Sequence, residues 1–416
     1  MTNDYRIAVS TIDDQWKGPK LAKLTNGNFI SIWEASDIDG DGRGIAGQLL
    51  ASNGLPLGSV FQINEDVAGN QRTPHFTSLS NGNFIASWHE DSTPSGAVEV
   101  YFRIFNASGI PITQQIQANQ VTNSNQLYIK HTEISGERIV LGWSSDGADS
   151  DGFGSVARVI DFSGNFLTDE FAINSHTNNN QHEPKFAPLQ NGGFVAVWTS
   201  HGGQDGNLHG AYGQLFDSSL QKVGSEFQIN TYTTSYQSAF QVLNLNNSNF
   251  VVIWTSHLQD GSEEGIYGQI YQEDGTAIGS EFRINTVTSG NQTQPSAIAT
   301  EDGGFYVVWS SNSSSHGSNS WDVFGQRIDS SGNKIGSEEQ INTFETSFQR
   351  NPGITEAGNG EALVLWSTAN HDDGLGGGVA GKFISYNDAP IITSDAHEIN
   401  FENSLQKINK FASISS

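Results

Sequence analysis

The chain has 416 residues, no cysteine, and 45 acidic against 19 basic side chains, so its formal net charge is −26. This charge repels phosphate backbones and anionic lipids and argues against nucleic-acid binding, and the lack of cysteine excludes a disulfide framework or a zinc–thiolate site. No apolar run approaches the ~20 residues of a membrane span, and residues 1–10 lack the basic start and apolar stretch of a cleaved secretory signal.

The first expected strand, residues 5–9, aligns with a motif that ends later copies of a repeat as Phe-x-Ile-Asn. Residues 5–9 precede the first copy, whereas the matching strand ends the later copies. The last copy stops after residue 384 without this strand. We therefore expect residues 5–9 to complete the last copy and to close a ring without an unpaired edge.

The repeat itself is an apolar run that follows a Gly or polar turn and ends in tryptophan, with spacings of 55 to 57 residues. A fixed period in this range indicates a repeat architecture. The repeat tryptophans are Trp33, Trp88, Trp143, Trp198, Trp254, Trp309 and Trp366. In the fourth copy Phe194, Ala196 and Trp198 fall on one face of a strand and Val195 and Val197 on the other, so both faces are apolar and must be covered.

Seven such copies predict an all-β fold, a seven-bladed β-propeller over residues 1–385 that is closed by the N-terminal strand and followed by a short C-terminal segment, 386–416. In the fourth copy the expected strands are 185–189, 194–199, 211–216 and 224–230. Short turns join the first strand to the second and the third to the fourth. The longer second-to-third loops and the links between blades then lie together on the other face of the disc, which we call the elaborated face.

The recurring Phe-Val-x-x-Trp, Gly-x-Tyr-Gly-Gln and Gly-Ser-Glu-Phe-x-Ile-Asn segments resemble the propeller-type repeats of large exported bacterial proteins of the RTX and cadherin-like adhesin group. The C-terminal segment, with Asn387 to Ile392 and then Glu402-Asn403-Ser404, is similar to the opening of a cadherin-like calcium-binding module of that group. The resemblance implies a calcium-associated binding or adhesion module, extracellular or at the cell surface, without a visible cleaved signal peptide.

Two acidic loops are candidates for a calcium site. The second-to-third loop of the first copy carries Asp37, Asp39 and Asp41 at alternate positions among glycines, and the third copy carries Asp149 and Asp151 in a weaker version. Hard cations take six to eight oxygen ligands, and glycine allows the chain to curl around the ion, so Ca²⁺ is the expected cofactor. The alternative is a solvated acidic turn.

Aromatic residues outside the repeat position are the candidates for ligand binding. Trp16, Trp321, Tyr232 and Tyr236 lie in segments of the elaborated face, where they could stack on sugar rings or anchor a protein partner. The repeat tryptophans, by contrast, are expected in the core. A glutamine that begins each copy is expected to pair with the backbone of the link rather than to bind a ligand.

His201, His209, His257 and His371 are expected to be hydrogen-bonding loop residues rather than metal ligands, because loops of neighbouring blades should lie too far apart to share a metal ion.

No catalytic constellation or nucleophile motif interrupts the repeat, so catalytic residues are predicted to be absent and an enzyme is the less favoured class. The alternatives are a polysaccharide-degrading or other carbohydrate-active enzyme on a propeller scaffold, and a structural spacer. The expected partner is a protein or carbohydrate on the elaborated face.

Overall fold

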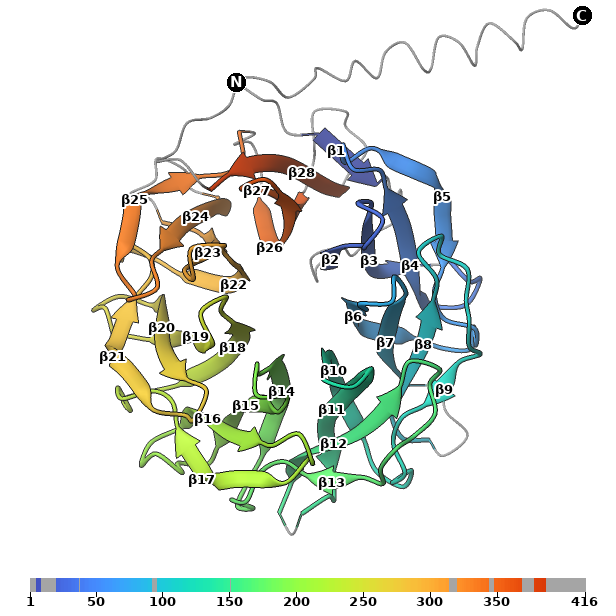
Figure 1. Ribbon diagram of the computed structural model, residues 1–416, viewed down its shortest axis with the longest axis horizontal. Coiled ribbons are helices and arrows are strands. Elements are labelled where there is room, and N and C mark those ends of the chain that lie inside the picture. The colour runs from blue at the N-terminus through green and yellow to red at the C-terminus, as the bar shows by residue number, and fades with distance from the viewer. Residues whose placement is uncertain are drawn as a thin grey trace, which may run out of the picture.

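The computed structural model describes residues 5–8, 20–36, 38–91, 96–149, 151–313, 320–343, 348–368 and 378–386. Within these ranges the chain is all β, and its strands form seven four-stranded antiparallel sheets. The sheets stand around a common axis as the blades of a propeller (Figure 1). The predicted seven-bladed β-propeller is confirmed. Across the described ranges there is no helix of the length and hydropathy that a membrane span requires.

We number the blades in chain order of their inner strands. The strands of each blade are given from the axis outward. Blades 1 to 3 consist of β2 (Lys20–Lys23), β3 (Phe29–Ser36), β4 (Arg43–Leu50) and β5 (Pro56–Gln62); of β6 (Gln71–Ser78), β7 (Phe84–Glu90), β8 (Glu99–Phe105) and β9 (Ile116–Gln117); and of β10 (Gln126–Ile134), β11 (Arg138–Asp146), β12 (Phe153–Asp161) and β13 (Phe171–Ala172).

Blades 4 to 6 consist of β14 (Gln181–Pro188), β15 (Phe194–His201), β16 (His209–Phe216) and β17 (Lys222–Gln228); of β18 (Gln237–Asn244), β19 (Asn249–His257), β20 (Glu264–Gln272) and β21 (Ala277–Arg283); and of β22 (Gln292–Ala299), β23 (Phe305–Ser311), β24 (Asp322–Ile328) and β25 (Lys334–Gln340). Blade 7 consists of β26 (Gln349–Gly358), β27 (Glu361–Thr368), β28 (Gly378–Ser385) and β1 (Tyr5–Ala8).

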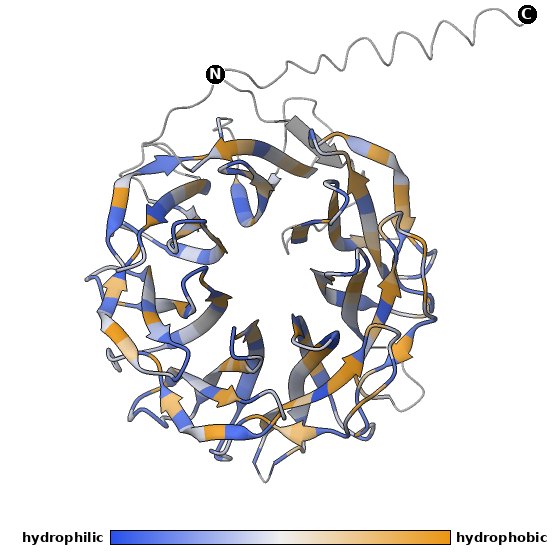
Figure 2. Ribbon diagram, viewed as in Figure 1, coloured by the Kyte–Doolittle hydropathy of each residue, from blue (hydrophilic) through white to orange (hydrophobic). Residues whose placement is uncertain are grey.

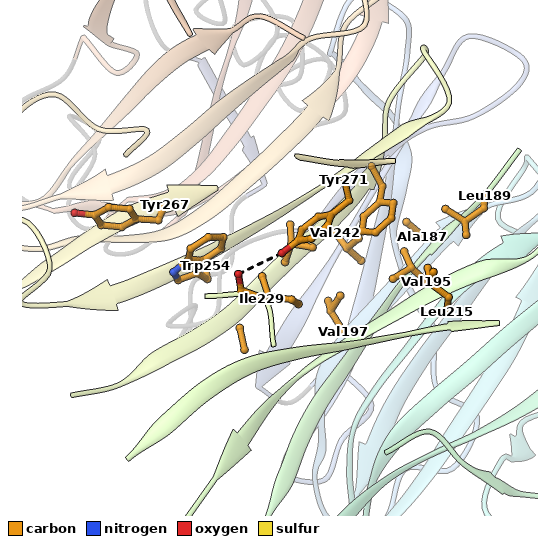
Figure 3. Close-up of a cluster of buried hydrophobic side chains, with 13 residues drawn as sticks. Ala187, Leu189, Val195, Val197, Leu215, Ile229, Val242, Trp254, Tyr267 and Tyr271 are labelled. Carbon is orange, nitrogen blue, oxygen red and sulfur yellow. Dashed lines mark hydrogen bonds between the residues drawn. The ribbon is translucent and has the colours of Figure 1, made fainter. Parts of the chain in front are cut away.

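The core lies between the blades, because each second strand is apolar on both faces. In β15, Val195 and Val197 pack against blade 5 together with its repeat tryptophan, Trp254 (Figure 3). Trp198 of the same strand packs toward blade 3. The outermost strands, such as β17, carry both hydrophobic and hydrophilic residues and are largely exposed (Figure 2). The doubly apolar run predicted from the sequence therefore forms the layer that joins neighbouring blades.

The ring closes where the sequence predicts. Strand β1 pairs antiparallel with β28, with Tyr5 opposite Gly381 and Arg6 opposite Ala380 (Figure 1). The first described strand of the chain therefore completes the last blade and covers an edge that would otherwise be open to another chain. Of the predicted C-terminal segment, 386–416, residues 387–416 lie outside the described residues, whereas Tyr386 is buried in a core cluster with residues of blades 6 and 7.

The repeated glutamines serve the links between blades, as predicted. Gln181, for example, donates from Nε2 to the carbonyl oxygen of Asn178 at 3.0 Å and accepts from Asn174 Nδ2 at 3.3 Å. Gln126 and Gln349 instead accept from the indole N–H of their own repeat tryptophans. Gln15 lies outside the described residues. The amides where they are described thus bond the protein's own links and tryptophans.

Candidate functional site

The seven inner strands surround a cavity of about 630 Å³ on the axis of the ring. One position of each inner strand, thirteen residues before the repeat tryptophan, lines this central cavity. The seven residues at this position are Lys20, His75, Lys130, Lys185, Gln241, Ser296 and Gly353. Blades 1 to 4 therefore present lysine or histidine to the axis, and blades 5 to 7 present neutral residues.

A second ring of residues lies two positions earlier in the inner strands, and these residues have a left-handed backbone. Their φ angles lie between 54° and 60°. They are Thr73, Tyr128, Glu183, Gln294 and Asn351, and all line the central cavity. Each lies in a β-bulge at which the register with the second strand shifts. This backbone is unfavourable for residues other than glycine, by about 1–3 kcal/mol each, and such strain concentrates at functional sites.

The neighbouring blade holds these bulges in place. The backbone N–H of Thr73 donates to Glu34 Oε1 at 2.6 Å, and that of Glu183 donates to Ser144 Oγ at 2.9 Å. Both acceptors directly follow the repeat tryptophan of the preceding blade. The bulge also explains why β14 begins at Gln181, four residues before the predicted strand: pairing with β15 continues on both sides of it.

The bulges lie at the end of the cavity that opens on the elaborated face. In blade 4 the second and third strands end in the pair His201 and His209, where their connecting loop begins. The inner strand starts at this same end, since Gln181 lies opposite Ser200. We call this end of the central cavity its mouth.

Histidine and tyrosine rings form a continuous series beside the mouth. The ring of His182 lies 4.9 Å from that of His201, which stacks on His209 at a centroid distance of 3.8 Å. Tyr236 lies 6.3 Å beyond His209 and stacks on His257 at 4.6 Å. All five rings are half-buried. We call these five residues the ring array.

Of the four loop histidines, His257 makes the expected hydrogen bond, with its Nδ1 2.9 Å from Ser235 Oγ, whereas His201 and His209 stack on one another. His182 and His201 belong to adjacent strands of one blade, and His201 faces His209 across a hairpin, so strand pairing brings them together. The spacing of His201 and His209 on either side of one loop was the available signal. His371 lies outside the described residues, and a group of three or more His, Cys, Asp or Glu side chains able to hold a metal ion does not occur within the described ranges.

Three histidines of the ring array are held in the neutral form. Burial, together with the neighbouring His209 and His182, lowers the pKa of His201 to about 4. Burial also lowers the pKa values of His182 and His209. Tyr236 donates its hydroxyl proton to Glu264 Oε1 at 2.9 Å, which fixes its ring. The array therefore offers flat faces with polar edges, and two exposed loop side chains beside it, Leu208 and Leu258, add apolar surface.

Glu183 is the only carboxylate among the described residues that line the central cavity. Burial opposes its ionisation, but Lys185 and Lys130 outweigh this effect and hold the pKa of Glu183 below its usual value. Lys185 Nζ lies 3.4 Å from Glu183 Oε2. Tyr128, on the neighbouring inner strand, has a raised pKa because of burial and of the charge on Glu183. The mouth thus combines an ionised carboxylate with a phenol that keeps its proton.

Of the aromatic residues predicted to bind ligand, only Tyr236 belongs to the ring array. Tyr232 lies in the same link, where its carbonyl oxygen accepts from Asn230 Nδ2 at 3.0 Å. Trp321 lies in blade 6 and is covered by the guanidinium of Arg350, 4.0 Å from its ring centroid. Trp16 lies outside the described residues.

The acidic loop of blade 1 bonds its own blade and the next link. Asp39 Oδ2 accepts from Asn64 Nδ2 at 2.7 Å, and Asp39 Oδ1 caps the backbone N–H of Asp41. Asp41 Oδ2 accepts from the backbone N–H of Gly69 at 3.1 Å. These bonds give the two carboxylates a structural role without a cation. Asp37 lies outside the described residues, and calcium stays a prediction.

Blade 3 repeats this arrangement. Asp149 accepts from Asn174 Nδ2 at 3.3 Å and from the backbone N–H of Asp151 at 3.2 Å. Asp151 accepts in turn from the backbone N–H of Asn179 at 3.1 Å. Asp205 and Asp260 occupy the place of Asp149 in blades 4 and 5. An aspartate that accepts a hydrogen bond from the asparagine of the Phe-x-Ile-Asn motif therefore recurs in blades 1, 3, 4 and 5.

In blade 2 the carboxylate that bonds the asparagine belongs to a strand residue, Glu99, instead of a loop aspartate. It forms a buried acidic pair with a second glutamate, Glu90. Asn119 bonds Glu99, which lies directly opposite Glu90 in the β7–β8 ladder. Both glutamates are almost fully buried, and the other blades have alanine, serine or threonine in place of Glu90. Burial, with the charges of Asp66 and Asp91, raises the pKa of Glu90 from 4.5 to about 7, although Gln115 donates to it.

Replacing Glu90 by Gln is expected to raise the melting temperature above pH 7 and to leave it nearly unchanged at pH 5. A carboxyl whose pKa is raised from 4.5 to about 7 in the folded state contributes stability below pH 4.5 that is lost as the pH rises through 7. Thermal unfolding of both proteins across this range measures the difference. The exposed Glu361→Gln exchange is the control, and equal pH dependence of Glu90→Gln and wild type would contradict the prediction.

Comparison with known proteins places this propeller among solved structures of low sequence identity. A polysaccharide lyase, Uly1, is similar over 92% of this chain and 92% of its own, with 8% identity and a TM-score of 0.57. The GH93 α-L-arabinofuranosidase of Fusarium graminearum (10% identity, TM-score 0.52) and an α-L-arabinanase of Penicillium chrysogenum (14%, 0.51) each cover 76% of this chain and 93% of their own. No family model and no curated protein sequence matches the chain.

These comparisons correct the functional expectations drawn from the sequence. The predicted resemblance to RTX and cadherin-like adhesins is wrong, because the similar structures are carbohydrate-active enzymes. The predictions of a calcium-associated adhesion module, and of a binding protein rather than an enzyme, are overturned by the same finding. At 8–14% identity the likeness establishes the propeller fold, and the residues of the mouth must carry any argument about chemistry.

Proposed function

We propose that this protein is a carbohydrate-active enzyme that binds a sugar chain along the ring array and acts on it at the mouth of the central cavity. The observation that carries the proposal is the series of five half-buried rings that leads to the only carboxylate of the cavity lining in the described residues. Sugars present apolar ring faces and polar edges, and flat aromatic side chains with polar tips match both. The similar arabinofuranosidase, arabinanase and polysaccharide lyase act on carbohydrates, which supports this class of ligand.

The mouth also supports proton transfer. Glu183 is ionised and can accept a proton, and Tyr128 retains a proton that it can donate. The two residues lie at equivalent bulges of neighbouring inner strands, so a bound sugar can meet both. A glycosidase with two carboxylates would need a second acid, which the described cavity lining lacks. We therefore assign the proton-accepting role to Glu183 and the donating role to Tyr128.

Because polysaccharides are found mainly outside the cell, we also propose an extracellular or cell-surface location for this protein.

The binding part is tested with Tyr236→Ala and His209→Ala. Each exchange removes one ring from the array, and we expect each to weaken oligosaccharide binding by roughly 5- to 10-fold, as the loss of about 1 kcal/mol of ring contact implies. Titration calorimetry with arabinan, galactan and uronate oligosaccharides measures the affinity, and release of new reducing ends from the polymers measures activity.

The matched control is His176→Ala, because His176 is a half-buried histidine of a link outside the ring array. It is expected to bind sugars as the wild type does. Wild-type affinity in both ring-array variants would place the sugar elsewhere. Failure of the wild type to bind or cleave any of these polymers would overturn the proposal.

A further inference from the structure

We propose that the central cavity is an anion site that receives a carboxylate or sulfate group of the bound sugar chain, so that the substrate is an acidic polysaccharide. The anion site is argued from the cavity alone, and only its assignment to a polysaccharide rests on the proposed function. Lys20, His75, Lys130 and Lys185 occupy one position in four consecutive inner strands and line the cavity together.

The charges of the three lysines all act on His75. The pKa of His75 is lowered well below its usual value by burial and then by His131, Lys130, Lys20 and Lys185. Three ammonium groups from three blades therefore act on one imidazole. Like charges brought together in a protein repel one another, and a bound anion removes this cost.

The sign of the cavity is opposite to that of the protein. The chain carries a net charge of −26 and only 19 Lys and Arg residues, yet among the described residues three lysines and a single carboxylate line this one cavity. That carboxylate, Glu183, already lies 3.4 Å from Lys185 Nζ. The cavity lining therefore keeps an excess of positive charge inside an acidic molecule, and such a cleft focuses its field on an anion that enters.

The fold does not need lysine at this position. Blades 5, 6 and 7 have Gln241, Ser296 and Gly353 at the equivalent place and form the same inner strands. A purely structural role, in which the lysine stems fill the axis, would be served by neutral residues in all seven blades. The charged lysines therefore belong to blades 1, 3 and 4 and are not spread evenly around the ring.

Two histidines of the cavity lining pack against each other. The rings of His75 and His131 lie 4.5 Å apart, and His75 Nδ1 and His131 Nε2 are shielded from solvent without a hydrogen bond in the described structure. The cavity volume of about 630 Å³ lies within the usual range of small-molecule sites.

The test uses the full chain and the double variant Lys20→Gln with Lys130→Gln, since glutamine is the residue that the fold itself has at this position in blade 5. Titration calorimetry compares oligogalacturonates, sulfated galactan oligosaccharides and neutral galactan oligosaccharides of equal length. The wild type is expected to bind at least one acidic probe ~10-fold or more tightly than the neutral one, with an affinity that falls as salt rises. The double variant should lose this preference and keep its affinity for the neutral probe.

The Ser296→Ala exchange, on the neutral half of the same position, is the matched control and should keep the preference. Competition by inorganic sulfate or by acetate distinguishes a sulfate from a carboxylate as the bound group. Equal binding of neutral and acidic probes by the wild type, or a preference that survives in the double variant, would overturn the anion site. Thermal unfolding checks that the double variant is folded. If it is not, the single Lys130→Gln variant is tested in the same way, and the same results support or overturn the anion site.

The outcomes also separate this inference from the proposed function. Cleavage of neutral polymers without any acidic preference would leave the enzyme and remove the anion site. Binding of sulfate or uronate that depends on Lys20 and Lys130, without conversion of any polymer, would leave the anion site and remove the enzyme.

Discussion

Replacing Glu183 by Gln is expected to lower kcat on the cleaved polysaccharide by roughly 10²- to 10⁴-fold, which is the usual contribution of a positioned acid or base. The exchange keeps the shape of the side chain and removes only its ability to accept the proton. Lys185 and Lys130 hold the pKa of Glu183 below its usual value, so the carboxylate is ionised throughout the neutral range. Activity of the wild type should therefore fall only at a pH below the usual pKa of a glutamate.

Binding separates this catalytic role from a structural one. The Glu183→Gln variant should bind oligosaccharides with nearly wild-type affinity, because the ring array is unchanged. The Tyr128→Phe variant should also lose activity while it binds. A Glu183→Gln enzyme with wild-type kcat would remove Glu183 from the chemistry, and equal losses of binding and activity would make it a binding residue.

Replacing Trp198 by Ala is expected to destabilise the protein by about 3–5 kcal/mol, the usual cost of removing a large buried aromatic side chain. Trp198 is fully buried and packs among residues of blades 3 and 4, including Val140, Ile173 and Phe186. Its loss leaves a cavity in the layer that joins these two blades. The free energy of unfolding in urea and the melting temperature measure the effect.

Trp321→Ala is the matched control, since this tryptophan lies outside the repeat position and is half-exposed against Arg350. It should cost about 1 kcal/mol or less, as most changes at partly exposed positions do. Similar losses in the two variants would show that the repeat tryptophans are not the principal contacts between blades.

Local patterns in the sequence were sufficient for the fold. The 55- to 57-residue period, the doubly apolar strand before each tryptophan and the displaced strand at residues 5–9 each predict a feature that the structure contains. These features depend on contacts within one repeat or between adjacent repeats. A repeat of this kind can bury its apolar faces only against copies of itself, so the period and the closing strand determine the ring.

The acidic loops show what a short motif leaves open. Asp39 and Asp41 have the spacing of calcium ligands, and in the structure each also accepts a hydrogen bond from the protein itself, so calcium stays a prediction. The same spacing serves an Asx-type turn and a bond to the next link. A short motif does not specify which of its possible partners, a cation or a neighbouring N–H group, lies within reach.

Only the tertiary structure brings the mouth together. His182, His201 and His209 belong to three strands, and Tyr236 comes from the link to the next blade, so the spacing along the chain indicates only the pair His201 and His209. Lys20, His75, Lys130 and Lys185 are about 55 residues apart and meet only because the ring turns one strand position of every blade toward the axis. Local strand patterning was enough to predict a closed ring of seven blades. The chemistry of its centre was decided by closure, which places residues from separate repeats around one cavity.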